Sequence, residues 1–310
     1  MEGGEREFVR RLQAGQGRLR AWTTLGIGDD MAVLRIDGAT VLVTTDMLLD
    51  GVHFSAREHS LEAIGHKAIA CGLSDCAAMA VRPLAATVSV ALAGNMALDD
   101  AHRLAEAMRR TADEYDCDLV GGDTTRWEHP LAIDVCMIAG VYPGIEPVRR
   151  SGARPGDVLA VTGPLGGSLA GRHMTFTPCV REARRIAEVL GADLHAMMDI
   201  SDGLSLDLAR MCEASSTGAR LEERDLDVVI SDAARSAGDG RSPLTHALED
   251  GEDFELLAAV APGAAARLRE LGLYRVGEMT QADLVIAGQD GTIRPLEPRG
   301  YDHFQGLRQG

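Results

Sequence analysis

The chain is poor in aromatic residues and has no long hydrophobic run. Phe, Trp and Tyr together make up 4% of its 310 residues, so stacking platforms are few. No apolar run reaches the roughly 18 residues of a membrane span, and the first residues, MEGGEREFVRRLQ, are polar and charged. We therefore expect a protein without a signal peptide or membrane contact, located in the cytoplasm.

Positive charge is also scarce. The formal net charge is −16, from 31 Lys and Arg against 47 Asp and Glu. Non-specific nucleic-acid binding needs basic side chains that displace phosphate counterions, so no nucleic-acid partner is expected. An acidic protein can still bind a polyanion such as ATP if divalent cations bridge the two, and many of its carboxylates would then be metal ligands.

The six cysteines form no CxxC pair. They are scattered among apolar neighbours, which favours buried free thiols in a reducing compartment over disulfides or a zinc site. They are Cys71, Cys76, Cys117, Cys136, Cys179 and Cys212. A Walker A motif, GxxxxGK[ST], is absent as well, so a nucleotide would have to be bound in another way.

The length predicts two domains, because 310 residues exceed one comfortable core. The composition turns polar and rich in Gly and Pro from Arg149 to Asp157. We place the boundary just before this stretch, giving an N-terminal domain of residues 1–148 and a C-terminal domain of residues 149–310. Helices are predicted near 5–14, 60–80, 98–116 and 181–190 and after 203, with strands near 85–92, 131–141, 158–162 and 256–260.

The stretch from Gly26 to Phe54 combines short apolar runs with acidic residues. Residues 32–34 and 40–43 are β-branched or aliphatic and predict two buried strands. The paired carboxylates Asp29 and Asp30 stand before the first, and an acidic turn, residues 44–46, follows the second. Carboxylates at strand ends beside glycines suit Mg²⁺. Ordinary turn chemistry is the alternative, and this stretch alone leaves both open.

Three further acidic positions follow the same pattern. Asp75 lies in a helix rich in Ala, Cys and Met, where a carboxylate needs a partner, as a structural residue or as a metal ligand. Asp123 follows Gly121-Gly122 after a short strand, a plausible phosphate or metal loop, although turns often contain this sequence. Asp199 lies three residues before Asp202, where an N-cap and a metal site are both possible.

Two other stretches allow more than one interpretation. The Gly-rich turn at 163–168 could hold phosphate on the backbone N–H groups of a helix start, or could be an ordinary connection. The acidic run Glu249–Glu255 leads into an apolar strand, so some of its members must lie near a sheet. An aromatic cluster, Tyr301 to Phe304, follows near the end of the chain.

Seven acidic positions therefore stand at predicted element ends, in a chain with no evident Cys–His pair. They are Asp30, Asp46, Asp75, Asp123, Asp199, Asp202 and Glu252. Together they describe a site for several magnesium ions. Phosphoryl transfer relies on positioning and charge neutralisation, so many metal ligands with one or two arginines, here Arg126 or Arg150, fit that chemistry.

Eight motifs resemble those of thiamine-monophosphate kinase, in the same order and over about residues 5–305. They are GIGDDMAVL, TTDMLLDGVHF, LSDCAAMA, GGDTTR, RSGARPGD, DISDGLSLDL, EDGEDFELL and GYDHF. That family is related to aminoimidazole ribonucleotide synthetase and selenophosphate synthetase. The resemblance implies a two-domain PurM-like α/β fold whose N-terminal sheet pairs with that of a second copy, so a homodimer with a barrel between its subunits is expected.

The resemblance also implies roles for individual residues. The magnesium positions would be Asp30, Thr45, Asp46, Asp75, Asp123, Asp199 and Asp202. The ATP contacts would be Gly122, Asp123, Arg150 and Ser201, and the thiamine-phosphate contacts His53, Glu252 and Tyr301. The implied reaction is direct in-line transfer of the ATP γ-phosphoryl group to thiamine monophosphate, with no side chain acting as acid, base or nucleophile.

One segment departs from the family, and two other functions compete. Between Gly171 and Asp199 the chain is short, and His173–Pro178 replaces a Pro-rich turn, which leaves the acceptor less certain than the kinase chemistry. Another ATP-dependent enzyme of the superfamily is the first rival, but the reactive Cys and Lys of selenophosphate synthetase and the C-terminal Cys of the hydrogenase-maturation relative are not found here. A non-catalytic nucleotide- or thiamine-phosphate-binding protein is the second, and its expected loss of carboxylates is not seen.

Overall fold

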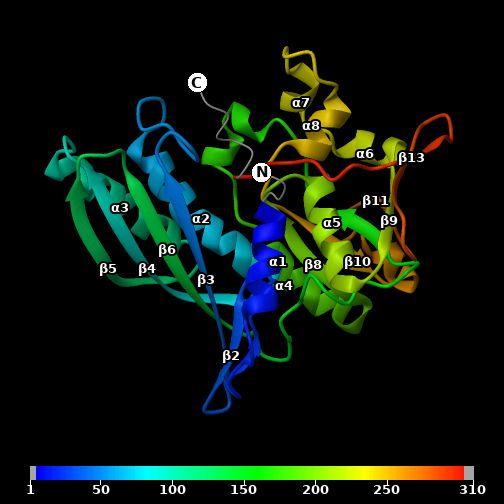
Figure 1. Cartoon of the computed structure of the whole chain (residues 1–310), viewed down its shortest axis with the longest axis horizontal. Helices are drawn as coiled ribbons and strands as arrows, with labels where there is room; N and C mark the ends of the chain where they lie inside the picture. Colours follow the sequence, from blue (N-terminus) through cyan, green and yellow to red (C-terminus); the bar gives the residue numbers. More distant parts are fainter. Residues whose placement is uncertain (1–4, 304–310) are drawn as a thin grey trace.

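Two mixed β-sheets organise the chain in the computed structural model, which describes residues 5–303 (Figure 1). The first sheet has the strand order β1-β2-β3-β6-β4-β5. Its strands are β1 (Thr23–Leu25), β2 (Ala32–Ile36), β3 (Ala39–Leu49), β4 (Arg82–Ala93), β5 (Asp118–Trp127) and β6 (Ala132–Gly140). The helices of this half are α1 (Glu5–Gly15), α2 (Leu61–Ala78) and α3 (Leu98–Asp113). Neighbouring strands are antiparallel except β4 and β5, which run parallel with α3 between them in the sequence.

The second sheet lies in the C-terminal half and has the order β13-β12-β9-β11-β7-β10-β8. Its strands are β7 (Val158–Val161), β8 (Leu194–Ile200), β9 (Gly218–Glu222), β10 (Glu255–Val260), β11 (Tyr274–Thr280), β12 (Leu284–Ala287) and β13 (Ile293–Pro295). The helices are α4 (Val180–Leu190), α5 (Leu204–Ser215), α6 (Glu223–Val229), α7 (Asp232–Ser236) and α8 (Pro243–Glu249). Short 3₁₀ turns occupy Ser168–Ala170, Arg172–Met174, Gly191–Asp193 and Pro262–Arg267.

Helix α2 connects the two halves. It begins at the predicted cap, where the Ser60 hydroxyl accepts a hydrogen bond from the Ala63 N–H at 3.2 Å. Its side chains are apolar on nearly all faces, as expected of a helix that is buried all round. It packs against α3 on one side, where a Cβ on Gly65 would come within 2.7 Å of the Ala107 Cβ, and against α4 and β8 on the other. The helix therefore belongs to both domains.

The hydrophobic core is divided by the second sheet. Along β10, Leu256 and Ala258 face a cluster that includes α2, α3, α4 and the first sheet, whereas Leu257 and Ala259 face a second cluster with α5. This alternation is the period-two pattern of a strand buried on both faces. The core between the sheets is thus continuous, and side chains from either half can meet within it.

Most predicted elements are confirmed, with ends that shift by a few residues. The predicted helices appear as α1 to α5 and the predicted strands as β4, β6, β7 and β10. All six cysteines are free thiols, and five of them are buried. Within residues 5–303, no helix combines the length and apolar character that a membrane crossing needs. Phe304 of the predicted aromatic cluster lies outside the described residues.

Two local predictions were wrong because both segments are strands. Residues 44–46 were expected to form a turn, but they lie in the middle of β3 and pair with residues 135–137 of β6. The GGDTTR segment was expected to form a loop and instead lies in β5. Glycine is needed there because a Cβ on Gly122 would lie 1.7 Å from the Val88 carbonyl oxygen of β4.

The Gly-rich turn at 163–168 is occupied by the chain's own carboxylates. The N–H of Gly166 donates to Asp253 Oδ2 and that of Gly167 to Asp250 Oδ2, each at 2.8 Å. No α-helix of the described chain begins at this turn, which leads instead into two short 3₁₀ turns. Of the two interpretations left open by the sequence, the structure favours an ordinary connection between elements. Its N–H groups are hydrogen-bonded to the acidic run, which was predicted to lie near a sheet.

Candidate active site between the two sheets

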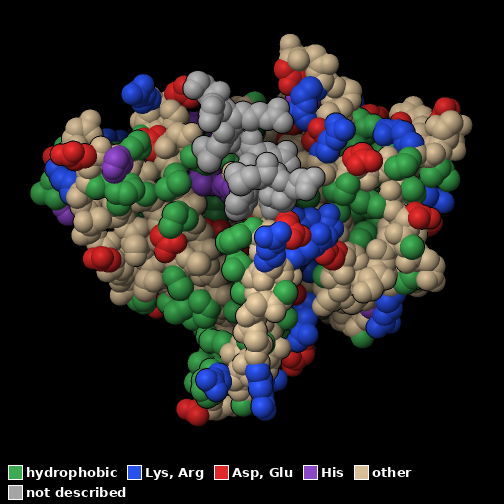
Figure 2. Space-filling model, in the orientation of Figure 1, with side chains coloured by type: hydrophobic (Ala, Val, Ile, Leu, Met, Phe, Trp, Pro, Cys, Tyr) green, Lys and Arg blue, Asp and Glu red, His purple; other side chains and the backbone are tan. Residues whose placement is uncertain are grey.

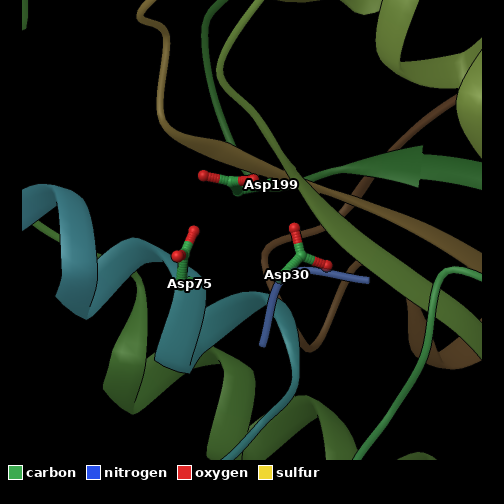
Figure 3. Close-up of side chains that lie close together, drawn as sticks. All are labelled: Asp30, Asp75 and Asp199. Carbon is green, nitrogen blue, oxygen red and sulfur yellow. The ribbon is translucent and has the colours of Figure 1, made fainter. Parts of the chain in front are cut away.

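Three of the predicted metal positions converge where α2 meets the second sheet. Asp30 precedes β2, Asp75 lies in the last turn of α2, and Asp199 lies near the end of β8. Each offers a carboxylate oxygen within 4.8 Å of the others, and Figure 3 shows their side chains around one space. Asp199 reaches this space because side chains alternate along β8, so that it shares the α2 side of the strand with Met197.

Burial, together with crowding of like charges, raises the pKa of Asp75 and of Asp199. Burial, followed by the charge of Asp30, raises the pKa of Asp199 to about 8. Burial and then the charges of Asp46, Asp199 and Asp30 raise the pKa of Asp75 well above its ordinary value. Two hydroxyl groups partly offset this effect, because Ser74 Oγ donates to Asp199 at 2.7 Å and Thr44 Oγ1 donates to Asp75 at 2.5 Å.

Asp46 adds an oxygen atom that has no hydrogen-bond partner in the described part of the chain. This atom, its Oδ2, is buried. Burial, followed by the charge of Asp134, raises the pKa of Asp46 to about 6. A buried carboxylate oxygen without a donor is costly unless a cation or water meets it. Oxygen ligands from several carboxylates at one place match what Mg²⁺ prefers, so the residues present fit that ion.

Two arginines lie near the acidic group, by which we mean Asp30, Asp46, Asp75 and Asp199. Arg150 forms a two-pronged pair with Asp30, with N–O distances of 2.6 and 3.1 Å, while its own backbone N–H donates to Asp29. Arg210 of α5 pairs with Asp202 and Asp207. Asp202 is therefore engaged by an arginine and does not join the other three carboxylates. Asp29 performs the turn chemistry that the sequence left as an alternative, and its neighbour Asp30 faces the cluster.

Thr45 and Asp123 lie on the opposite face of the first sheet. Thr45 is exposed and donates to Asp134 Oδ1 at 3.0 Å. Asp123 of β5 is exposed and paired in register with Ser89 of β4, which is paired with Asp134 of β6. Paired positions across a sheet project from the same face, so these side chains lie away from α2. Strand geometry within one chain thus separates them from Asp46, Asp75 and Asp199.

The remaining predicted arginine and ATP positions are also dispersed. Arg126, near the end of β5, donates to the carbonyl oxygens of Gly94 and Met96, which follow β4. Gly122 is packed against β4. Ser201 lies two residues after Asp199, and its carbonyl oxygen accepts the N–H of Glu252 at 2.6 Å. Ser201 therefore links the acidic group to the residues predicted to hold the acceptor.

The three predicted acceptor residues come together in one group. The His53 ring lies 5.5 Å from that of His303, which lies 4.8 Å from the ring of Tyr301. Glu252 contributes to raising the pKa of Tyr301, after burial, so its charge is near the phenol. Lys67 connects the group, because its ammonium donates to the His53 carbonyl oxygen and to Glu252 Oε1, each at 2.6 Å. This acceptor group (His53, Lys67, Glu252, Tyr301, His303) is completed by residues from both halves of the chain.

The segment that departs from the family packs beside this group. Phe176 stacks on Phe254 with ring centroids 4.1 Å apart, and its carbonyl oxygen contacts His66 of α2. A cavity of about 280 Å³ lies here, lined by Pro164, Arg172, Thr175, Phe176, Thr177, Asp253, Phe254 and Glu255. The segment is therefore adjacent to the loop that carries Glu252, as a role in shaping the acceptor pocket would require.

The sequence interpretation missed three polar residues of this junction. Ser74, Arg210 and Lys67 all contact predicted site residues. Ser74 was within reach, because it is the immediate neighbour of the predicted ligand Asp75. Lys67 could have been noticed because it is the only lysine in the sequence. Arg210 gave no such signal, because arginine is common in this sequence and its partners are defined by the folded geometry.

Comparison with known proteins gives consistent matches over nearly the whole chain. The family described as AIR synthase related protein matches residues 28–141 with its N-terminal domain and residues 154–288 with its C-terminal domain. Thiamine-monophosphate kinase of Rhodopirellula baltica is 41% identical, covering 96% of this chain and 97% of the relative. That of Escherichia coli (strain K12) is 33% identical, covering 98% and 99%. A solved structure of AaThiL complexed with AMPPCP and TMP has a TM-score of 0.80 at 26% identity, covering 97% of each chain.

Proposed function

Because the chain belongs to the thiamine-monophosphate kinase family, we propose that it transfers the γ-phosphoryl group of ATP to the phosphate of thiamine monophosphate. A phosphate oxygen of the acceptor forms the new bond to the γ-phosphorus. The bond from that phosphorus to the bridging oxygen breaks, and ADP leaves with the electron pair. The observation that carries this function is the meeting of Asp30, Asp75 and Asp199 beside the acceptor group.

The acidic group would hold magnesium. Asp30, Asp75 and Asp199 are the primary ligands we propose, with the unsatisfied oxygen of Asp46 adjacent to them. Magnesium bound there would neutralise charge on the phosphates and orient them. The wider set includes Asp202, Thr45 and Asp123. Asp202 would join once Arg210 turns to another partner, whereas Thr45 and Asp123 lie on the opposite face of the first sheet, and their place in the set rests on the family resemblance.

The ATP contacts are proposed to come from Arg150, Ser201, Gly122 and Asp123. Arg150 has the best support, because its guanidinium already lies at the rim of the acidic group. A planar guanidinium binds phosphate oxygens in pairs, so this side chain can follow the triphosphate as it binds. Ser201 lies between the acidic and acceptor groups, where the γ-phosphate has to pass.

His53 is proposed to donate a hydrogen bond to the acceptor rather than to accept a proton. Its Nδ1 accepts the Leu49 N–H at 3.0 Å, so the proton of the neutral ring lies on Nε2. Burial, followed by the charges of His303 and Lys67, lowers the pKa of His53 to about 4. The ring is therefore neutral near pH 7. No base is needed, since a phosphate monoester with a second pKa near 6 is already mostly ionised there.

We propose that the open face of the first sheet is the interface of a homodimer. Helices α2 and α3 cover the other face, whereas hydrophobic side chains gather on the open one (Figures 1 and 2). Met47 on this face and Val120 on β5 are each 61% exposed. Sedimentation of a Met47→Lys variant tests this, because a charge in an apolar interface should shift a dimer to monomers. An unchanged dimer would place the interface elsewhere.

The reaction can be tested directly. The protein is incubated with ATP, Mg²⁺ and thiamine monophosphate, with free thiamine as a parallel acceptor, and the products are separated by chromatography. Thiamine diphosphate formed from the monophosphate alone is the expected result. ADP without thiamine diphosphate would indicate a different phosphate-bearing acceptor, and metal-dependent ATP binding without ADP would indicate a non-catalytic binding protein. The six free thiols of the chain support cytoplasmic localisation, where the reaction is proposed to occur.

A further inference from the structure

We propose that Lys67 is a positioning residue for the acceptor: its ammonium holds Glu252 and the turn carrying His53 in the arrangement that receives thiamine monophosphate. The inference rests on the proposed function and extends it to a residue outside the proposed ligand set. Lys67 is the only lysine among the 310 residues, and its side chain is fully buried. Burial of an unpaired ammonium is energetically unfavourable, so the groups that pair with Lys67 indicate its role.

Lys67 joins two segments that are remote in the sequence. From α2 its Nζ donates to the carbonyl oxygen of His53, in the turn after β3, and to Oε1 of Glu252, in the loop before β10. The second partner is 185 residues away. Each contact is 2.6 Å long, which is short for a charge-assisted hydrogen bond. One ammonium therefore fixes the N-terminal and C-terminal sides of the acceptor group relative to each other.

The backbone around Glu252 is constrained in the same place. Glu252 has a φ of +62° and Phe254 a φ of +52°, a region that residues other than glycine rarely adopt. The Glu252 N–H donates to Ser201 O at 2.6 Å. Unusual backbone conformations of this kind are unfavourable and persist only where the surroundings impose them. The Lys67 contact holds the Glu252 side chain, and the Ser201 contact holds its main chain.

Charge gives a reason for a lysine at this position. Thiamine monophosphate brings a phosphate group, and an unpaired Glu252 carboxylate in the same group would repel it. Like charges close together in a partly buried site repel each other. The Lys67–Glu252 pair is neutral, so Glu252 can orient the acceptor without opposing the phosphate. Its side chain remains 21% exposed, so the paired carboxylate is still reachable from the site.

An apolar pair would stabilise the fold equally well or better. Replacing a buried ion pair by apolar or neutral groups of similar volume is often neutral or stabilising, whereas removing one partner leaves a buried charge uncompensated. The proposal therefore predicts that stability and acceptor recognition separate in a double variant. Lys67→Met alone should damage both, and Lys67→Met/Glu252→Gln should recover stability without recovering acceptor recognition.

The experiment measures KM for each substrate, kcat and the melting temperature of wild type, Lys67→Met, Glu252→Gln and the double variant. We expect Lys67→Met to lower kcat/KM for thiamine monophosphate by about 10–100-fold, the range of strong pairwise coupling, with KM for ATP nearly unchanged. The double variant should show a similar loss at a near wild-type melting temperature. Arg103→Met, which removes an exposed cation paired with Glu62 of α2, is the matched control and should change neither constant.

Two results would overturn the inference. Recovery of both stability and acceptor KM in the double variant would mean that Lys67 only offsets the burial of Glu252. Equal increases of KM for ATP and for thiamine monophosphate would mean a general structural role. If Lys67→Met fails to fold, the double variant, which contains no unpaired charge, is compared with Glu252→Gln. A further loss of kcat/KM for thiamine monophosphate supports the inference, and equal values contradict it. Failure of the wild type to form thiamine diphosphate would instead reject the proposed function. The wild type is therefore assayed before the variants are compared.

Discussion

Two groups of carboxylates lie along the same helix, and the protein neutralises them differently. Near the end of α2, Asp75 and Asp199 face each other with hydroxyl donors from Thr44 and Ser74. About two turns earlier on α2, Lys67 supplies a fixed ammonium to Glu252. Burial and then the charge of Asp30 raise the pKa of Asp199 to about 8, so a bound cation would stabilise the ionised carboxylate. In the acceptor group, the ammonium of Lys67 already neutralises the Glu252 carboxylate.

The two arrangements suit the different roles that we propose for them. A fixed ion pair sets a geometry and leaves no net charge, which suits the binding of a substrate that carries its own phosphate. An uncompensated acidic group is unstable by itself and becomes favourable when an ion arrives with its ligand. Breaking each group separately should therefore give different losses, in activity on one side and in acceptor recognition on the other.

The largest effect is expected from Asp199→Asn. Metal-assisted neutralisation of phosphate charge supplies several kcal/mol, so turnover should fall by about 10³-fold, at about 1.4 kcal/mol per tenfold. The melting temperature without Mg²⁺ should stay the same or rise, because a repelling charge has been removed. Turnover is measured as the rate of thiamine diphosphate formation. Asp113→Asn, an exposed position of α3, is the control, and near-normal turnover of Asp199→Asn would remove that residue from the metal set.

The next effect is the response of stability to pH and Mg²⁺. The pKa values of Asp199, Asp29 and Asp207 are raised to about 8, 7 and 7, in each case first by burial. The folded protein then binds more protons than the unfolded chain above pH 4, so without metal its stability should fall as the pH rises towards 8.

Added Mg²⁺ should reverse this trend. The ion needs ionised carboxylates, so its stabilising effect should be larger at pH 8.5 than at pH 6, reaching about 2.7 kcal/mol when the ion is present at 100 times its Kd. Thermal melting at both pH values, with and without Mg²⁺, measures it. An equal Mg²⁺ effect at the two pH values would contradict the assignment of these acids to the metal group.

A smaller effect is expected from Ser74→Ala. The variant removes the hydroxyl that donates to Asp199 at 2.7 Å, leaving a buried acceptor unsatisfied at a cost of about 1–3 kcal/mol. Because that hydrogen bond lowers the pKa of Asp199, its loss should raise the pKa further and move the Mg²⁺ requirement to higher pH. The Mg²⁺ concentration for half-maximal rate, measured from pH 6.5 to 8.5, should increase most at low pH. A uniform change across this range would argue against the proposed link.

The smallest effect is expected from His53→Gln. Loss of one neutral hydrogen bond, worth about 0.5–1.5 kcal/mol, should lower kcat/KM for thiamine monophosphate by about 2–10-fold. The ratio of wild type to variant should be constant between pH 6 and 8, because the pKa of His53 is lowered to about 4 and its ring does not titrate there. In stability, His53 acts opposite to the acids, since the unfolded chain takes up its proton between pH 6.5 and 4. A ratio that changes near pH 6.5 would show that the ring titrates normally.

Much of the architecture was predictable because it depends on local patterns. The Ser60 cap, the amphipathic spacing of α3 and the apolar runs of β7 and β10 are each short-range signals, and the structure confirms them. Residues 44–46 and 121–126 were misjudged because glycine and acidic residues are typical of turns. Only pairing with β6 and β4 places those segments in strands.

The identity and order of the acids, arginines and histidines can be read from the sequence alone. Which of these side chains meet depends on how the strands and helices pack. Alternation along β3 sends Thr45 and Asp46 to opposite faces, and alternation along β8 turns Asp199 towards α2. The Lys67–Glu252 pair joins residues 185 positions apart. No short-range pattern encodes such a contact, because it depends on strand register and on the packing of α2 between the two halves.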